Sequence, residues 1–224
     1  MTVTSPAVQL TEIVRKDLRL EARAGEALLV TLPFGAVALI LVPLAVGTDV
    51  PLLRQIGAGL YWVVVLLFGV LVTMRQSAVD GPSQRALLQL CGVDPVVRVL
   101  GRTVANAVLL LAVEVLLAPV AVALYDPDLS GWPWLLPILP LVAAGLAALG
   151  ALADGLSESL AERVAIGPLL VVPLSLPLLL GATQVLQGPR YGRSPWPWLL
   201  LVVTVDLVVV AAATLTARSL EEAS

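Results

Sequence analysis

The sequence predicts an all-α membrane protein with six transmembrane helices. Of its 224 residues, 59% are hydrophobic and only 13% are charged, and the mean hydropathy is +0.99. Soluble proteins average about 45–50% apolar and about 25% charged residues, which excludes a soluble domain. Six apolar stretches lie between segments rich in glycine, proline and polar residues, and each is near the length of about 20 residues that crosses a bilayer.

The six predicted spans cover more than half of the chain. They run over residues 27–46, 56–74, 104–125, 134–153, 164–184 and 198–216. The 26 residues before the first span are polar and charged, so we expect this span to be a retained helix and not a cleaved signal peptide.

Lysine and arginine are distributed unequally between the two sides of the predicted membrane. Ten lie on one side: Arg15, Lys16, Arg19, Arg23, Arg75, Arg85, Arg98, Arg102, Arg163 and Arg218. Only Arg54, Arg190 and Arg193 lie on the other. Because positively charged loops stay in the cytoplasm, we expect both termini there. The chain then divides into a cytoplasmic arm (1–26), a transmembrane domain (27–216) with a cytoplasmic loop (75–103), and a cytoplasmic tail (217–224).

Aromatic residues are expected to mark the outer membrane interface, where amphipathic rings prefer to lie. All five tryptophans and all three tyrosines fall at or near this side: Tyr61, Trp62, Tyr125, Trp132, Trp134, Tyr191, Trp196 and Trp198. The sequence Trp-Pro-Trp-Leu-Leu occurs at 132–136 and again at 196–200. The repeat could reflect a duplication of two halves, but we favour two independent interfacial anchors in which proline begins a helix.

The N-terminal arm predicts an amphipathic interfacial helix over residues 10–23. Its apolar residues fall on one side of a helical wheel, opposite the basic ones: Leu10, Ile13, Val14, Leu18 and Leu20. Asp17 and Glu21 share the apolar side, which suits a helix that lies beside other protein. The alternative is a plain positively charged flank of the first span.

The loop between the second and third spans is longer than a connection between neighbouring helices requires. Asp80 and Gly81 precede Pro82 in a turn, and Ser83 is placed to cap a short helix. That helix carries Leu87, Leu88 and Leu90. Asp94-Pro95 then begins a helix that continues into the third span. Apolar residues at a cytoplasmic tip need a partner, so we expect a coupling surface here.

Several kinds of chemistry are excluded by residues that the chain lacks. It has no histidine, one cysteine (Cys91) and one lysine (Lys16), and that lysine is not part of a phosphate-binding loop. An internal disulfide, a Cys/His zinc site and a histidine base are therefore impossible. The net charge of −3 offers no basic surface for nucleic acid. We expect no catalytic, cofactor or metal site, and any ATP must be bound by another subunit.

Two acidic residues, Glu114 and Asp206, lie inside predicted spans. An acid at the centre of a membrane helix costs about 2.5–3.5 kcal/mol on insertion scales, so a partner or a purpose is expected. One interpretation is a proton relay or a polar seam between subunits. The other, which we favour, is a tolerated acid bonded to a backbone carbonyl or to a polar side chain such as Asn106 or Gln184.

Four motifs follow one another along the chain: Arg-Lys-Asp-Leu-Arg-Leu at 15–20, Gly-Ala-Gly-Leu-Tyr-Trp at 57–62, Asp80-Gly81 before the leucine-rich tip, and a proline-punctuated span at 167–182. In these motifs and their order the chain resembles the CcmB family, the membrane subunit of the haem exporter in cytochrome c maturation. This resemblance implies an ABC-2-like, six-span permease of the bacterial inner membrane. It also implies a homodimer that works with a CcmA-like ATPase, CcmC-like and CcmD-like membrane subunits and a CcmE-like haem chaperone.

The resemblance implies a non-catalytic role in haem export or in release of the haem-loaded chaperone. Without histidine, an iron could be approached only by Tyr61, Met74, Cys91, Tyr125 or Tyr191, and we expect this chain not to ligate haem. Two alternatives stay open. One is an ABC-2-type exporter of a lipid, glycan or drug, and the other is an ion-coupled secondary transporter that uses Glu114 and Asp206.

Overall fold

The computed structural model describes residues 5–24, 26–47, 49–79, 93–127, 129–159 and 166–222, and this part of the chain contains helices and no β-strand. The α-helices are α1 (Pro6–Ala24), α2 (Glu26–Val46), α3 (Val50–Val79), α5 (Pro95–Tyr125), α6 (Leu135–Ser159), α7 (Ile166–Gln187) and α8 (Trp196–Glu222). Two 3-10 helices, η1 (Leu129–Trp134) and η2 (Gly188–Tyr191), precede α6 and follow α7.

The predicted spans are helical wherever the structure describes them. Five segments are long and apolar enough to cross a membrane: Val50–Leu71, Pro95–Tyr125, Ser130–Leu156, Leu169–Tyr191 and Trp196–Ser219. The first span corresponds to α2, which has 21 residues and is therefore about 31 Å long at 1.5 Å per residue. Its described apolar part is Leu32–Val46. An all-α, multi-pass membrane protein is thus confirmed.

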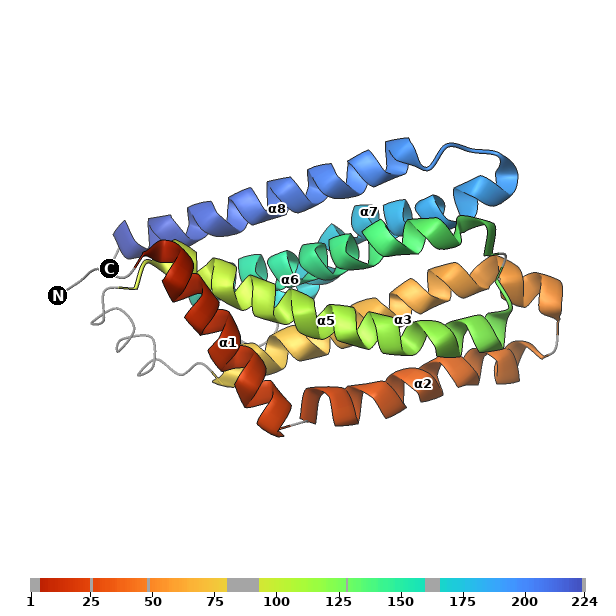
Figure 1. Cartoon of the computed structure of the whole chain (residues 1–224), viewed down its shortest axis with the longest axis horizontal. Helices are drawn as coiled ribbons and strands as arrows, with labels where there is room; N and C mark the ends of the chain where they lie inside the picture. The colour runs from red at the N-terminus through yellow and green to blue at the C-terminus, as the bar shows by residue number, and fades with distance from the viewer. Residues whose placement is uncertain are drawn as a thin grey trace.

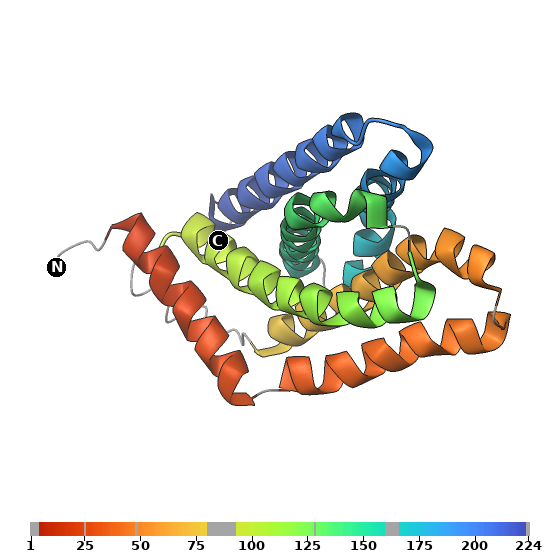
Figure 2. The same ribbon diagram turned by 45° about the vertical axis from the view of Figure 1, so that its right-hand side comes forward.

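The long helices run side by side along one axis (Figure 1). Both chain termini lie at one end of this bundle, which we call the terminal end (Figures 1 and 2). The connections from α2 to α3, from α5 to α6 and from α7 to α8 lie at the opposite end, which we call the distal end. An even number of membrane crossings places both termini at the same end of the bundle.

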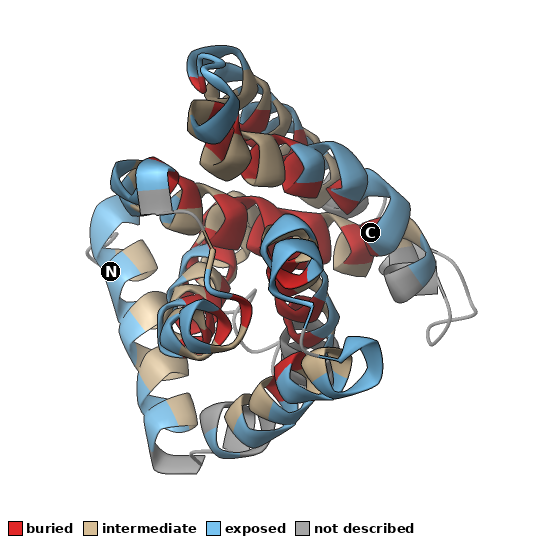
Figure 3. Cartoon of the chain, turned by 90° about the vertical axis from the view of Figure 1, so that its right-hand side faces the viewer, coloured by how far each residue is buried: buried red, intermediate tan, exposed pale blue. Residues whose placement is uncertain are grey.

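Helix α6 occupies the centre of the bundle and packs against α3, α5, α7 and α8. Its buried residues form an almost continuous run from Val142 to Gly150, and buried positions of the bundle face inward (Figure 3). This run consists mostly of alanine and glycine, which allow helices in a membrane to approach closely. At Gly145 the missing side chain leaves room for Leu178 and for the carboxyl group of Asp206.

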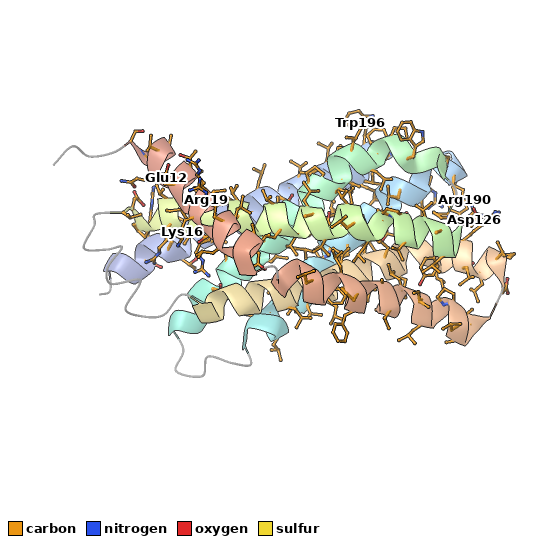
Figure 4. The ribbon with its side chains drawn as sticks, turned by 60° about the horizontal axis from the view of Figure 1, so that its bottom comes forward. Glu12, Lys16, Arg19, Asp126, Arg190 and Trp196 are labelled. Atoms are coloured by element: carbon orange, nitrogen blue, oxygen red, sulfur yellow. The ribbon has the colours of Figure 1, made fainter. Side chains whose placement is uncertain are left out.

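Helix α1 lies obliquely across the terminal end of α5 (Figures 1 and 2). Ile13 packs on Gly101, where an added Cβ would lie 2.8 Å from Ile13 Cγ2. The predicted apolar residues Leu10, Ile13, Val14 and Leu18 are half-buried, whereas Leu20 is 50% exposed, so its place on the packed side was wrong. Glu12, Lys16 and Arg19 project at this end (Figure 4).

The helices extend further than the apolar stretches. Helix α3 begins at Val50, so the predicted connection 47–55 is shorter and Arg54 lies on a helix. The predicted cap at Asp94 is confirmed, since Val96 N donates to Asp94 Oδ1 at 2.7 Å. The boundaries differ because backbone hydrogen bonding continues into polar residues at the membrane surface.

Three of the aromatic residues predicted near the outer interface are buried in the bundle. Tyr61, Trp62 and Tyr125 are at most 5% exposed, because they lie on faces of α3 and α5 that point into the bundle. Exposed rings at the distal side include Trp132, Tyr191 and Trp196. The two Trp-Pro-Trp segments contact each other: the rings of Trp134 and Trp196 meet edge to face with centroids 5.3 Å apart. The repeat therefore joins η1 to the start of α8.

Candidate functional site

The predicted coupling residues Asp80, Gly81, Ser83, Leu87, Leu88 and Leu90, together with Cys91, lie outside the described residues. The helices that flank them are described. Helix α3 ends and α5 begins at the terminal end, where α5 packs against α1 (Figure 1). Both attachment points of the segment therefore lie on the side where the termini are.

Glu114 lies in α5 and is completely buried, with 0% of its surface exposed. Neither oxygen of its carboxyl group has a hydrogen-bond partner among the described residues. Its backbone carbonyl does have one, since the hydroxyl of Tyr61 in α3 donates to it at 2.8 Å. Because the side chain is enclosed by its own chain, it does not reach a surface where a second copy could form a polar seam with it.

Asp206 lies in α8 and is 8% exposed. Its carboxyl group packs on Gly145 of α6, and neither oxygen finds a hydrogen-bond partner in the described part of the chain. The hydrogen bonds that we expected from Asn106 or Gln184 to a buried acid are not present. Asn106 is itself buried with its side-chain oxygen unpartnered. The structure does not link the two acids by a hydrogen bond.

A pocket opens at the distal end between α3, α5, η1 and α7, and sequence reasoning missed it. Its empty space, including the open mouth, is about 790 Å³. The lining residues are Arg54, Gly57, Ala58, Tyr61, Ala118, Ala121, Val122, Tyr125, Pro127, Gly131, Trp132, Leu135, Leu186, Gln187 and Arg190. The wall is mostly apolar, and its two cationic residues are Arg54 and Arg190.

Most polar groups of the pocket wall are engaged in bonds that hold the helices together. Besides the Tyr61 bond, the hydroxyl of Tyr125 donates to the carbonyl of Leu39 in α2 at 2.7 Å. Gln187 Nε2 donates to the carbonyl of Gln55 at 3.2 Å, which joins α7 to α3. Glycine allows the close approach of α3 and α5, since a Cβ at Gly57 would lie 2.6 Å from Tyr125 Cβ.

The two arginines of the pocket differ in their partners. Arg54 forms an ion pair with Asp126, and its Nε lies 3.2 Å from Asp126 Oδ2. Arg190 has its guanidinium 5.7 Å from the ring centre of Tyr191 and has no acidic partner among the described residues. Figure 4 shows Arg190 and Asp126 at the same end of the bundle, far from Glu12, Lys16 and Arg19.

Among the described residues, the pocket lining contains no cysteine, serine or acidic residue, and the hydroxyls of its two tyrosines donate to backbone carbonyls. No group of three or more acidic or cysteine residues in the described ranges could hold a metal ion. A signal for the pocket does exist in the sequence, namely small residues at Gly57, Ala58, Ala118 and Ala121. It could not be interpreted without knowing that α3 faces α5.

Comparisons with known proteins identify the family. The family model described as "CcmB protein" matches residues 8–222. "Heme exporter protein B" of Haemophilus influenzae is 31% identical over 180 residues, covering 79% of this chain and 80% of that protein. The proteins of the same name from Paracoccus denitrificans and Pseudomonas aeruginosa are 29% and 30% identical, over 91% and 90% of this chain and 94% and 93% of their own lengths. With a match that extends from α1 to the end of α8, the chain belongs to the CcmB protein family.

Proposed function

We propose that this chain is the membrane permease subunit of an ATP-driven, ABC-type complex for cytochrome c biogenesis. The observation that carries the proposal is family membership over residues 8–222 together with relatives named for haem export. The chain itself has no phosphate-binding loop, so a separate ATPase hydrolyses ATP. Hydrolysis is coupled to haem export or to release of a haem-loaded chaperone.

The proposed assembly contains two copies of this chain and two of a CcmA-like ATPase, with CcmC-like and CcmD-like membrane subunits and a CcmE-like chaperone. It lies in the bacterial inner membrane with the terminal end in the cytoplasm. The excess of Lys and Arg at that end supports this orientation. The distal pocket then faces the outer side.

Coupling is proposed to pass through residues 80–92. Helix α3 ends and α5 begins on the proposed cytoplasmic side, which is where an ATPase would bind. Apolar side chains at Leu87, Leu88 and Leu90 suit a protein interface, and Asp80, Gly81 and Ser83 would shape its turn and cap.

The test is the double variant Leu87→Asp plus Leu88→Asp, in the complex purified with its ATPase. We expect the ATPase to be lost from the complex or its activity to be no longer stimulated. The matched control, Leu87→Ile plus Leu88→Ile, keeps both side chains apolar and should behave as the wild type. If the aspartate variant assembles and stimulates ATPase activity normally, the coupling role is wrong.

An ion-coupled secondary transporter is the second candidate, because Glu114 and Asp206 are buried acids whose carboxyl groups lack partners among the described residues. It predicts transport that collapses with the proton gradient and survives ATP depletion. An ABC-2-type exporter of a lipid, glycan or drug would instead leave covalently bound haem normal in c-type cytochromes after deletion of the gene.

A further inference from the structure

We propose that the distal pocket binds one anionic phospholipid from the bilayer, with its phosphate between Arg54 and Arg190 and an acyl chain along the apolar wall. This inference goes beyond the proposed function and does not depend on it, because it rests on the geometry of the pocket alone.

The mouth of the pocket provides the site for the phosphate. Arginine binds phosphate through paired, charge-assisted hydrogen bonds. Arg190 is exposed, its guanidinium lies over the ring of Tyr191, and it forms no ion pair with an acidic residue in the described part of the chain. Arg54 shares its charge with the carboxylate of Asp126, and both groups are exposed to solvent, so this pair is weak enough for Arg54 to turn toward a second anion.

The interior of the pocket provides the site for the acyl chain. Along α3 the wall runs from Arg54 to Tyr61, seven residues deeper, which is about 10 Å of helix. On the facing helix, Ala118 and Ala121 have short side chains and leave the space open. The hydroxyl of Tyr61 points away into its bond with the Glu114 carbonyl, so the ring presents an apolar surface.

The rim of the pocket gives the ligand access from the bilayer. Val122 and Trp132 line the pocket and are 39% and 61% exposed on the outside of the bundle. Tryptophan is enriched at the level of lipid headgroups. A ligand that enters beside Trp132 would have its anionic head at the level of the lipid headgroups and its apolar tail at the level of the hydrocarbon core.

The polar groups of the wall favour a lipid over an iron porphyrin. Among the described residues the lining contains no histidine, cysteine or methionine, and the hydroxyls of Tyr61 and Tyr125 already donate to backbone carbonyls. An iron would therefore find no free axial ligand in the wall. A free phosphate ion would use the mouth but leave the apolar interior unfilled.

The test is native mass spectrometry of the full-length protein in detergent, titrated with phosphatidylglycerol and with phosphatidylcholine of the same chains. We expect one phosphatidylglycerol to bind at least about tenfold more tightly than phosphatidylcholine, because the choline group of phosphatidylcholine would bring a second positive charge beside the two arginines. Arg190→Ala and Arg54→Ala should remove most of this preference. Arg193→Ala is the matched control, because Arg193 is exposed at the same end but does not line the pocket.

Two further variants test the headgroup contact and the acyl-chain contact separately. Asp126→Asn frees Arg54 and should tighten phosphatidylglycerol binding, whereas Ala118→Phe fills the interior and should weaken both lipids. The proposal is overturned if Arg193→Ala has the same effect as Arg190→Ala, or if the two lipids bind alike. It is also overturned if inorganic phosphate or iron protoporphyrin displaces the bound phosphatidylglycerol, since the site would then take a free anion or a porphyrin.

Discussion

The hydroxyl of Tyr61 in α3 donates to the backbone carbonyl of Glu114 in α5 at 2.8 Å. The bond joins two helices in the interior of the bundle, and both residues are buried. It uses the backbone of Glu114 and leaves the carboxyl group of the same residue without a partner among the described residues. Tyr61 therefore contributes to the packing of α3 on α5, independently of the chemistry of the Glu114 side chain.

Tyr61→Phe should lower the free energy of unfolding by about 0.5–1.5 kcal/mol, because it removes one interhelical hydrogen bond and leaves the ring in place. Thermal unfolding in detergent measures this change. Tyr191→Phe is the matched control, since Tyr191 is 60% exposed and its hydroxyl takes part in no hydrogen bond that joins described helices. Equal effects of the two substitutions would contradict a structural role for the Tyr61 bond.

Glu114→Gln should retain function, measured as covalently bound haem in c-type cytochromes of a complemented deletion strain. The substitution keeps the shape of the side chain and does not touch the carbonyl that Tyr61 binds. Glu114→Leu should raise the free energy of unfolding by about 1 kcal/mol, because it removes an unsatisfied buried polar group. Val115→Leu, on the exposed side of α5, serves as the control for added volume. Loss of haem attachment in a stably folded Glu114→Gln protein would instead support a proton-carrying role.

Gly145→Ala should destabilise the protein by about 1–3 kcal/mol, since the new methyl group would overlap the Asp206 carboxyl group and Leu178. Combining it with Asp206→Ala should recover part of this loss, because one of the two overlapping groups is then absent. Both effects are measured as shifts of the thermal unfolding midpoint.

The matched control for that substitution is Gly59→Ala. Gly59 is also in a helix, but an added Cβ there would have no atom of the described residues within 4 Å apart from its chain neighbours and the backbone of its own helix. Alanine favours helix over glycine by up to about 1 kcal/mol, so this variant should be as stable as the wild type or more so. If Gly145→Ala were equally harmless, the close packing of α6 and α8 at Asp206 would be wrong.

Apolar length predicted the long helices of the bundle, because crossing the hydrocarbon core requires a long apolar helix. It did not predict helix ends. Residues 50–55 are helical although they include Arg54 and Gln55. At the membrane surface such polar side chains are solvated by water, so they do not prevent the helix from extending beyond the apolar stretch. Nor did it predict the burial of Trp62, because interfacial position along a helix says nothing about which face of the helix points inward.

The candidate site could be predicted only in part. Glu114 and Asp206 stand out in the sequence as acids within apolar runs, and both are buried. The distal pocket depends on the pairing of α3 with α5 and of η1 with α7. Gly131, for instance, packs directly on the carbonyl of Leu186. Contacts between segments so far apart in the chain leave no periodic signal in either one.

Gly101→Val should loosen α1, because the added side chain would displace Ile13 from α5. The trypsin sites Arg15, Lys16 and Arg19 all lie on α1, so the rate of cleavage there reports how often the helix detaches. If docking weakens by about 1.4 kcal/mol, cleavage should be about tenfold faster. Val8→Ala, at a position 50% exposed on the same helix, should leave the rate unchanged.

Cys91 provides a test of orientation, because it is the only thiol of the chain. The segment that contains it is attached to α3 and α5 at the terminal end, which we propose to be cytoplasmic. A membrane-impermeant maleimide should therefore label inverted vesicles and spare right-side-out vesicles. Cys91→Ser with Arg193→Cys moves the thiol to the distal end, so its labelling pattern should be reversed. Labelling of wild-type protein in right-side-out vesicles would place the terminal end outside the cell. Residues 80–92 could then not contact a cytoplasmic ATPase, and the proposed coupling role would be wrong.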